Sequence, residues 1–469
     1  MAKSKNHEYV VVTYLFLALF IALIGYFIYF MVFQSENFIN NPYNSLQNLF
    51  SEYVVRGDIE SADGYTLATT KTDSDGNETR SYPYKDLFAH AVGYTGHGKF
   101  GLENQANFLL LRSHSMYANQ LLNDIKGEKN PGDTVVTTLN YKLQQTAYDA
   151  LGSHDGAVIV MEPSTGKILA MVSKPAFDPN RIAEEWDDIV SGEDALLVNR
   201  ATQGKYAPGS VFKILTLLEY YREQEGDVSD FSFDCESYFT YDGKTIHCAS
   251  DKTHGTEDLE QAFANSCNSA FAFVSLALDR AKFQKTCDEL LFNRDLPVAF
   301  ESGQSRFQIS SEDSSSLVME TGIGQGKTLM SPLHILLLAS AIDNNGSLMT
   351  PYLIDSVKNT DGEVIKTYSP AVWGDLLTAQ EASFLEDYMR AVVTDGTGSK
   401  LDCEEYTAYG KTGTAQVSDT TDQTNAWFAG YAKSDGKEDI AVAVIVEDSG
   451  SGSRYAVPAA KKIFDAYFE

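Results

Sequence analysis

The chain has 469 residues, more than one ordinary hydrophobic core holds, so we expect at least two domains. Its formal net charge of −29, from 36 basic and 65 acidic residues, disfavours nucleic-acid binding because such a surface repels phosphate backbones. The composition, 43% hydrophobic and 22% charged, is that of a globular protein without low-complexity bias.

The N-terminus carries a membrane signal. Residues 9–33 contain no charge, and about 20 apolar residues span a bilayer as a helix. Lys3 and Lys5 precede the run, so the positive-inside rule places residues 1–8 in the cytoplasm and the rest of the chain outside. The alternative is a cleaved signal peptide, but the run is long and ends in Phe30–Phe33 rather than in small residues. We therefore predict a cell-membrane protein held by one uncleaved helix.

The pattern after this run divides the chain into two units. Residues 34–150 mix short strand-like runs with turns and end in a candidate strand at Thr134–Leu139 followed by a helix, which predicts a small pedestal domain. Residues 151–469 predict a larger unit. It begins with two strand-like runs, 157–162 and 167–172, which the turn between them joins as an antiparallel hairpin.

The rest of the larger unit contains both helical and strand-like patterns. Helices are predicted at Val211–Glu223, Leu259–Asp279, Lys282–Phe292, Pro332–Asp343 and Pro458–Phe468, and strands at Lys411–Val417, Ala426–Tyr431 and Ile440–Val446. Because strands at both ends enclose a helical middle, we expect one sheet built from distant parts of the chain with a helical subdomain beside it. The predicted fold class is α+β.

The cysteines are odd in number and widely spaced, which does not predict a disulfide framework: Cys235, Cys248, Cys267, Cys287 and Cys403. Cys235 and Cys248 are the one plausible pair, because they flank a hairpin predicted around Asp242–Gly243. A disulfide and two free thiols are both open for this pair. The absence of any Cys-x-x-Cys pair argues against a structural zinc site. The histidines include no His-x-x-x-His pair for metal catalysis, so we predict no metal and no cofactor.

Ala207-Pro-Gly-Ser210-Val-Phe-Lys213 opens a helix, with Lys213 one turn after Ser210 on the same face. A serine nucleophile needs an adjacent base, and a helix N-terminus stabilises developing negative charge. Because Ser-x-x-Lys arises often by chance, this motif alone does not identify an active site.

Ser266-Cys267-Asn268 precedes a second apolar helix. The hydroxyl of Ser266 can relay a proton, and the carboxamide of Asn268 can bind a peptide backbone through both its donor and its acceptor. An ordinary helix cap accounts equally well for the motif when it is taken alone.

Lys411-Thr412-Gly413-Thr414 begins a predicted strand near the C-terminus. Glycine lets the backbone approach a substrate closely, and the lysine and hydroxyls suit a carboxylate. A strand at a sheet edge can pair with an extended peptide. Taken alone, this motif also fits a strand entry with chance threonines.

The order Ser-x-x-Lys, Ser-x-Asn, Lys-Thr-Gly resembles that of the penicillin-binding transpeptidases, in their class B, monofunctional form. Arg56-Gly57-Asp58-Ile59 and Gly101-Leu102-Glu103 resemble signatures of the family's pedestal, and Gly322-Ile-Gly-Gln-Gly326 is also similar. Ser61–Ala62 departs from the Asp-Arg of the family, outside the active site. The resemblance implies a penicillin-binding, serine-β-lactamase-like domain, with an antiparallel sheet flanked by helices plus a helical subdomain.

By that resemblance, Ser210 attacks the penultimate D-Ala carbonyl of a peptidoglycan stem peptide, and an amine of a neighbouring peptide then resolves the acyl-enzyme. Lys213 would take the serine proton and Ser266 would pass a proton to the leaving amine. A β-lactam antibiotic would acylate the same serine. The resemblance also counts Lys411 among the catalytic residues, where it would bind the substrate carboxylate with Thr412 and Thr414. The backbone N–H groups of Ser210 and Thr414 would form the oxyanion hole. The substrate-binding residues implied by the family are Asn268, Thr412, Gly413 and Thr414.

Two other functions use the same motifs. A D,D-carboxypeptidase or a β-lactamase would resolve the ester with water, but the pedestal favours a transpeptidase. A β-lactam sensor or a scaffold of the wall-synthesis complex would bind its ligand or partner without catalysing a reaction. Only eight residues precede the anchor, which disfavours a sensor. The resemblance also implies a partner, a polytopic glycan-strand polymerase of the SEDS family.

One near-match to a nucleotide site is rejected. Gly322-Ile-Gly-Gln-Gly326-Lys327-Thr328 resembles a phosphate-binding loop, but that pattern requires glycine at position 321, where Thr321 stands.

Overall fold

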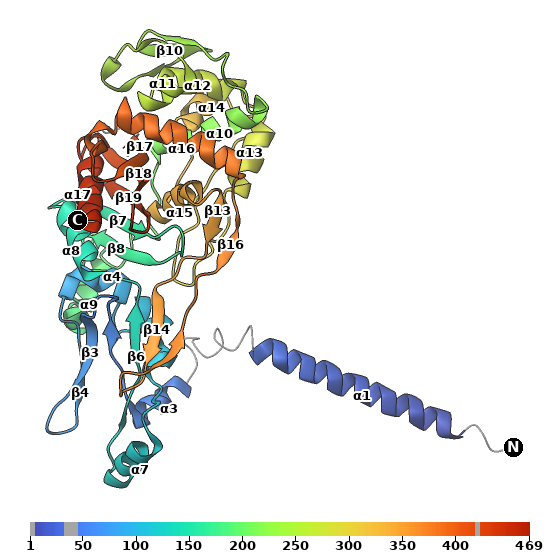
Figure 1. Ribbon diagram of the computed structural model, residues 1–469, viewed down its shortest axis with the longest axis vertical. Coiled ribbons are helices and arrows are strands. Elements are labelled where there is room, and N and C mark those ends of the chain that lie inside the picture. The colour runs from blue at the N-terminus through green and yellow to red at the C-terminus, as the bar shows by residue number, and fades with distance from the viewer. Residues whose placement is uncertain (1–4, 32–45, 418–422) are drawn as a thin grey trace.

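The computed structural model describes residues 5–31, 46–417 and 423–469. Its body is elongated, with helices at the top of Figure 1, a five-stranded sheet in the middle and a narrower pedestal below. Helix α1 (Lys5–Tyr29) lies apart from this body. The helical part, the five-stranded sheet and the pedestal therefore follow one another along the long axis of the body.

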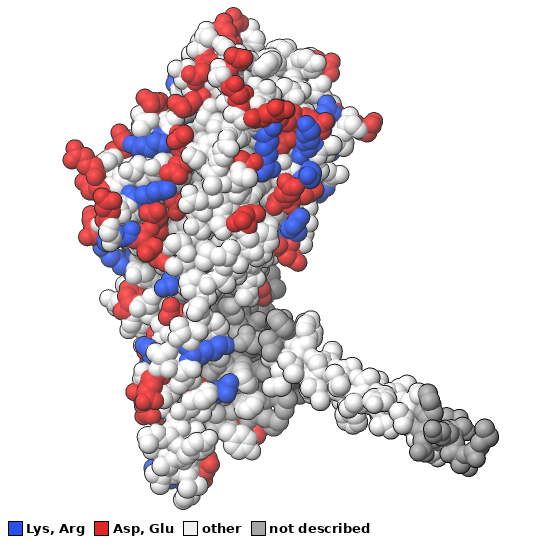
Figure 2. Space-filling model, turned by 45° about the vertical axis from the view of Figure 1, so that its right-hand side comes forward, with Lys and Arg blue, Asp and Glu red and all other residues white. Residues whose placement is uncertain are grey.

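Helix α1 has the properties of a membrane span. Its stretch Tyr9–Tyr29 has a mean hydropathy of 2.5, and none of it is buried against the rest of the protein. In Figure 2 the part of this helix that is not drawn in grey has no charged side chains, whereas acidic side chains are spread over the upper body. The predicted span continued to residue 33, and residues 32 and 33 lie outside the described part of the chain, as do residues 1–4.

The pedestal is built on a sheet whose described strands have the order β15-β14-β6-β2-β3-β4. These strands are β2 (Ile59–Glu60), β3 (Thr66–Thr72), β4 (Glu78–Ser81), β6 (Thr134–Thr137), β14 (Ile354–Lys358) and β15 (Val364–Thr367). Around them lie the short parallel pair β1 (Val54–Val55) and β5 (Asn130–Pro131), and the helices α3 (Leu46–Tyr53), α4 (Ala89–Val92), α5 (Gly101–Gln105), α6 (Asn107–Leu110) and α7 (Tyr117–Lys126).

The two pedestal signatures of the sequence meet at a buried carboxylate. Glu103 is fully buried, and its two oxygens accept from Arg56 Nε at 2.6 Å and Arg80 Nε at 2.7 Å. Burial alone would raise the pKa of Glu103, but the two guanidinium charges hold this pKa below its ordinary value. A buried charge is tolerated when it is paired in this way, so these residues tie the start of the pedestal chain to α5.

The middle of the molecule is an antiparallel sheet with the order β17-β18-β19-β7-β8 among the described strands. The strands are β7 (Gly156–Met161), β8 (Ile168–Lys174), β17 (Thr407–Gln416), β18 (Thr424–Lys433) and β19 (Ile440–Val446). The predicted hairpin is β7–β8, and the three C-terminal strands lie close to their predicted positions. Distant parts of the chain therefore share one sheet, as the pattern indicated.

Both faces of this sheet are covered by helices. Alternate residues of β7 point to opposite faces: Val158 and Val160 pack with α8 (Tyr141–Ala150) and α17 (Ala456–Phe468), whereas Ile159 packs on the other side with the wholly buried α15 (Pro332–Asp343). This explains why β7 is a continuous apolar run rather than an alternating one.

The helical part contains α10 (Lys213–Glu223), α11 (Leu259–Ala264), α12 (Asn268–Ala277), α13 (Arg280–Glu289), α14 (Ser315–Gly322) and α16 (Ala379–Thr394), whereas α9 (Ile182–Ser191) packs lower down beside α4. The single helix predicted at Leu259–Asp279 is wrong, since it is divided into α11 and α12. Ser266 has a φ of 57°, a left-handed conformation that an α-helix cannot continue. The side chains of Asp258 and Cys267 cap the two helices separately.

The hairpin predicted around Asp242–Gly243 is present. It joins β10 (Tyr238–Tyr241) to β11 (Lys244–His247), and both turn residues have positive φ, 48° and 77°. Beside it, β9 (Phe233–Cys235) pairs with β12 (Gly255–Glu257), and β13 (Ser347–Met349) pairs with β16 (Val372–Asp375) below the helical part.

The predicted division of the chain at residue 150 differs from the structure at two places. Helix α8, placed in the pedestal by sequence, packs on the five-stranded sheet. Strands β14 and β15, placed in the larger unit, extend the pedestal sheet through pairing of β14 with β6. Both errors arise because the apolar pattern of a segment shows that it is buried but not against which sheet.

Candidate active site

Ser210 lies in a tight turn rather than in regular helix. The turn η4 (Gly209–Phe212) is a 3₁₀ helix that leads directly into α10. Gly209 has a φ of +55°, and its N–H donates to the carbonyl of Gly324 at 2.8 Å. A Cβ on Gly209 would lie 2.6 Å from the carbonyl oxygen of Thr414. The turn is therefore held between the loop around Gly324 and strand β17, with Ser210 only partly buried.

Lys213 joins the first two motifs. Its side chain is fully buried, and its Nζ donates to the carbonyl of Ser266 at 2.7 Å, the hydroxyl of Ser266 at 3.3 Å and Oδ1 of Asn268 at 2.8 Å. Burial lowers the pKa of Lys213 to about 8, because removal from water disfavours the charged amine. An amine with this pKa can release its proton near neutral pH.

The loop that presents Ser266 and Asn268 is fixed by backbone bonds. The N–H of Ser266 donates to the carbonyl of Phe263 at 3.0 Å, and that of Cys267 donates to the carbonyl of Ala262 at 2.8 Å. These bonds end α11 and hold the left-handed conformation of Ser266. The amide nitrogen of Asn268 donates to the carbonyl of His247 at 2.9 Å, so the loop is also tied to the end of β11.

The third motif lies on β17, at one edge of the described five-stranded sheet. Lys411 is fully buried, its Nζ donates to the carbonyl of Thr412 at 3.3 Å, and it lies 5.2 Å from the ring centroid of Phe263. Burial, and the nearby charge of Lys213, lower the pKa of Lys411 well below its ordinary value. Thr414 is exposed. This edge therefore offers an exposed hydroxyl beside buried amines.

The structure thus brings together residues that are up to 204 positions apart in the chain, from Ser210 to Thr414. The turn η4 packs on β17, Lys213 bonds the loop before α12, and Lys411 is close enough to Lys213 to lower its own pKa. The eight predicted site residues lie on these three neighbouring segments: Ser210, Lys213, Ser266, Asn268, Lys411, Thr412, Gly413 and Thr414.

Two residues that sequence analysis missed contact the third motif. Thr397 follows α16, and its hydroxyl bonds that of Thr412 at 2.6 Å. Gly452 donates its N–H to the hydroxyl of Thr414 at 3.3 Å, and a Cβ there would lie 2.5 Å from the carbonyl oxygen of Gly413. Both stand in short runs of glycine with serine or threonine, 396–399 and 449–453, and such runs are a usable signal for loops that approach a site closely.

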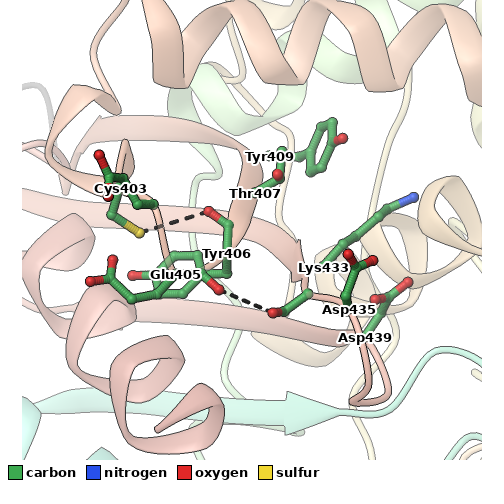
Figure 3. Close-up of a pocket in the computed structure, with 10 residues that line it drawn as sticks. Cys403, Glu405, Tyr406, Thr407, Tyr409, Lys433, Asp435 and Asp439 are labelled. Atoms are coloured by element: carbon green, nitrogen blue, oxygen red, sulfur yellow. Dashed lines mark hydrogen bonds between the residues drawn. The ribbon is translucent and has the colours of Figure 1, made fainter.

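A separate hollow lies on the same sheet. Ten residues line it, among them Cys403, Tyr406, Tyr409 and Lys433, and none of the predicted site residues is included (Figure 3). Lys433 there already pairs with Asp343 and Glu386, each at 3.1 Å. We assign no catalytic role to this hollow.

All five cysteines lie within the described residues and are free thiols. The sulfurs of Cys235 and Cys248 are 3.7 Å apart, well beyond the roughly 2.05 Å of a disulfide bond. The sequence argument against a zinc site considered only close pairs of cysteines, whereas the fold brings Cys235, Cys248, His254 and Cys267 together with ligand atoms within 4.8 Å of one another. The four residues come from separate loops, which a search for close pairs in sequence cannot detect.

Comparisons with known proteins match both parts of the chain. Residues 156–468 match the model of the penicillin-binding protein transpeptidase domain, and residues 56–135 match that of the penicillin-binding protein A dimerisation domain. The peptidoglycan D,D-transpeptidase PbpA of Mycolicibacterium smegmatis is 31% identical, over 89% of each chain.

Two solved structures are similar in fold. The D,D-transpeptidase domain of a peptidoglycan glycosyltransferase from Eggerthella lenta is 29% identical with a TM-score of 0.77, over 88% of this chain and 97% of that one. The imipenem acyl-enzyme complex of penicillin-binding protein A from M. tuberculosis is 26% identical with a TM-score of 0.78, over 88% of this chain and 99% of that one.

The packing of Gly324 on the Ser210 turn leads to a stability prediction. A Cβ on Gly324, where φ is +76°, would lie 2.0 Å from the carbonyl oxygen of Gly209. Gly326 has a similar φ of +69°, but its Cβ would meet side chains rather than backbone, the nearest atom being the end of the Leu317 side chain at 3.0 Å. We expect Gly326→Ala to lower the free energy of unfolding by about 1–2 kcal/mol through backbone strain alone, and Gly324→Ala to lower it by clearly more.

Chemical denaturation of the two variants beside the parent measures this difference. Equal losses for the two variants would show that the turn does not depend on the close approach of Gly324.

Proposed function

Because the chain belongs to the penicillin-binding transpeptidase family, we propose that it is a membrane-anchored peptidoglycan D,D-transpeptidase that cross-links stem peptides through an acyl-enzyme on Ser210. The observation that carries the assignment of residues is the position of Lys213. One buried amine contacts both Ser266 and Asn268, and it follows Ser210 by three residues at the start of α10.

In the acylation step, the Ser210 hydroxyl attacks the carbonyl carbon of the penultimate D-Ala and its proton passes to neutral Lys213. The pKa of about 8 supports this role, because a base works best when its pKa is near the working pH. The carbonyl oxygen becomes negative and is stabilised by the N–H groups of Ser210 and Thr414. The contact of Gly209 with the Thr414 backbone supports this pairing of donors.

The tetrahedral intermediate then loses the terminal D-Ala. Its nitrogen takes a proton through the hydroxyl of Ser266, which lies 3.3 Å from Lys213 Nζ, and the C–N bond breaks to leave an ester on Ser210. An amine of a second stem peptide attacks this ester in the reverse sequence, and the proton that it loses returns to Ser210. A β-lactam forms the same ester, but its leaving amine stays tethered to the acyl group.

Substrate binding is assigned to the edge of β17 and to Asn268. The edge strand can pair with an extended peptide, and Gly413 allows its backbone to approach. The hydroxyls of Thr412 and Thr414, with the amine of Lys411, face the substrate carboxylate in this proposal. An anionic carboxylate favours the charged form of Lys411, which offsets the effect of burial on its pKa.

The proposed topology follows from α1. Lys3 and Lys5 precede the apolar stretch Tyr9–Tyr29, which supports a cytoplasmic N-terminus and an extracytoplasmic catalytic domain. The catalytic domain then faces the compartment that contains peptidoglycan. Protection of the body from protease added outside spheroplasts would contradict this orientation.

We also propose a SEDS-family glycan polymerase as partner, on the resemblance to class B proteins. An exposed apolar face on the pedestal supports this proposal. Helix α7 exposes Tyr117, Leu121, Leu122 and Ile125, the last to 74%. Apolar patches of this kind on a pedestal suit docking to another protein.

The acyl-enzyme is tested by intact-mass spectrometry of the full-length chain after incubation with a fluorescent penicillin. We expect a stable mass increase equal to that of the penicillin, and no increase for Ser210→Ala, because only the hydroxyl oxygen can form the ester. Circular dichroism of the variant serves as the folding control.

Each result of this experiment separates the alternatives. A missing adduct on the parent would contradict the acyltransferase assignment, whereas rapid loss of the adduct would favour a β-lactamase. A stem peptide supplied with an acceptor amine distinguishes the remaining pair, since a transpeptidase yields the cross-linked dimer and a D,D-carboxypeptidase yields only the shortened peptide.

The lowered pKa of Lys213 predicts a pH dependence of acylation. Only the neutral amine accepts a proton, so the acylation rate constant is expected to rise about tenfold per pH unit below about pH 7 and to level off above pH 8. Stopped-flow fluorescence with saturating penicillin measures this rate constant. Lys213→Arg keeps the positive charge but stays protonated throughout this pH range, so this variant should not acylate at any of these pH values. A flat profile for the parent would rule out Lys213 as the base.

The polymerase partnership is tested by co-purification in detergent. We expect Leu121→Glu with Ile125→Glu to abolish co-purification, because two carboxylates would be desolvated at the interface. Val190→Glu places a carboxylate at an equally exposed apolar position on α9 and should leave co-purification intact. Retention of the polymerase by the double variant would exclude α7 from the interface.

A further inference from the structure

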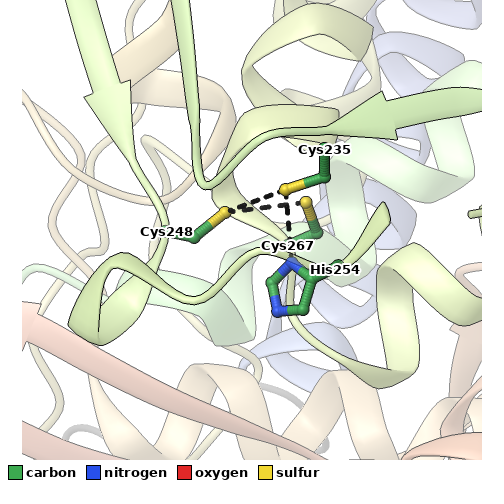
Figure 4. A group of neighbouring side chains, drawn as sticks. All are labelled: Cys235, Cys248, His254 and Cys267. Carbon is green, nitrogen blue, oxygen red and sulfur yellow. Dashed lines mark hydrogen bonds between the residues drawn. The ribbon is translucent and has the colours of Figure 1, made fainter. Parts of the chain in front are cut away.

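Three cysteines and a histidine converge beside the second motif (Figure 4). Cys235 ends β9, Cys248 follows β11, His254 precedes β12, and Cys267 caps α12. The three cysteines are buried, and the side chain of His254 is only 5% exposed. Four separate segments thus place soft ligand atoms around one point in the interior.

Three of the six separations between these ligand atoms match the edges of a tetrahedron around a metal, and the other three lie within 4.8 Å. The sulfur of Cys248 lies 3.7 Å from each of the sulfurs of Cys235 and Cys267, and Nδ1 of His254 lies 3.4 Å from the sulfur of Cys235. Zinc bonds of about 2.3 Å to sulfur and about 2.0 Å to nitrogen give tetrahedral edges of about 3.8 Å between sulfurs and about 3.5 Å between sulfur and nitrogen. The 3.7 Å separations between the sulfurs are too long for a disulfide bond.

The surroundings suit thiolate ligands. The backbone N–H of Ala270 points at the sulfur of Cys267 at 3.4 Å, and the hydroxyl of Ser269 lies 3.2 Å from the sulfur of Cys248. Such donors stabilise metal-bound thiolates from outside the ligand shell. The buried Glu257 adds a carboxylate oxygen that has no hydrogen-bond partner among the described residues and lies 3.8 Å from Nδ1 of His254. A zinc ion with three thiolates carries one net negative charge, so this carboxylate stands outside the ligand set and gains no net charge stabilisation from the ion.

We infer that Cys235, Cys248, His254 and Cys267 bind a structural Zn²⁺ ion that fixes the loop carrying Ser266 and Asn268. Three thiolates and one imidazole in tetrahedral arrangement favour zinc over the harder magnesium and calcium ions. All four positions are filled by protein, so the site is closed and has no place for a reacting water. Binding releases the three thiol protons to solvent.

The proposed zinc site is linked to the active site by residues that are adjacent in sequence to two of its ligands, Cys267 and Cys248. Cys267 stands between Ser266 and Asn268 in the chain, so a metal bond to its sulfur restrains both residues that contact Lys213. Cys248 follows His247, whose carbonyl accepts from the amide of Asn268. The ion therefore acts as a positioning element for the proposed proton relay. This consequence rests on the proposed function, whereas zinc binding itself does not.

The test begins with the zinc content of the full-length chain, purified in detergent without chelator and measured by plasma mass spectrometry. We expect about one zinc per chain in the parent and in Cys403→Ser, which changes a cysteine outside the cluster. Cys235→Ser and Cys248→Ser should lose the ion. X-ray absorption spectroscopy of the parent at the zinc edge should show three sulfur neighbours and one nitrogen. This result does not depend on how well the variants fold.

A parent chain without stoichiometric zinc, even after zinc is supplied during growth, would overturn the inference. So would a mass two hydrogens lower that places a disulfide within the cluster, or equal zinc in the parent and the Cys235→Ser variant, which would mean an adventitious ion only.

The positioning role is tested by reversible removal of the metal. Chelation of the parent should lower the acylation rate with fluorescent penicillin by about tenfold or more, since a small misplacement of catalytic groups has such effects, and added zinc should restore it. Unchanged acylation by metal-free protein would refute the positioning role while the zinc content still stands on its own. No acylation of the zinc-loaded parent would instead count against the proposed function.

Discussion

Lys213 is a fully buried amine whose hydrogen bonds reach the backbone and hydroxyl of Ser266 and the carboxamide of Asn268. Burying a charged amine without hydrogen-bond acceptors would cost free energy, so Lys213 needs these acceptors. The acceptors do not remove the whole effect of burial, because the pKa of Lys213 is still lowered. The relative placement of α10 and of the loop before α12 depends on this contact. The turn that carries Ser210 and the loop before α12 are therefore positioned by the same group that is proposed to move the proton.

A second constraint is the close approach of backbone to backbone around Ser210. Side chains at Gly209, Gly324 or Gly452 would lie within 2.6 Å of backbone oxygens on a neighbouring segment. Glycine at these positions lets the Gly324 loop pack on the turn η4, and lets that turn and the Gly452 loop pack on β17, without intervening side chains. The Gly-rich run 322–326, which resembled a phosphate-binding loop, has this structural role: it packs against the turn η4, which carries Ser210.

The five-stranded sheet beside the site is covered by helices, whereas the pedestal and the N-terminal helix expose apolar side chains. The five-stranded sheet is covered on both faces, and β17 is left at its edge for an extended ligand. The pedestal holds a paired buried carboxylate, Glu103, while α7 and α1 present apolar surface. This arrangement suits the proposed membrane-anchored enzyme, in which the pedestal is proposed to bind a protein partner and the sheet edge is proposed to receive the substrate.

The sequence by itself determined what depends on local pattern. The apolar runs predicted β7, β19 and α15, the Asp242–Gly243 pair predicted its hairpin, and the order of three short motifs predicted the family. Tertiary structure alone decided which distant segments meet: β14 joins the pedestal sheet, Thr397 bonds Thr412, and three cysteines and His254 share one point. Local periodicity and motifs report burial and residue type, but contacts across loops of tens of residues depend on how the whole chain packs, which no single window of sequence contains.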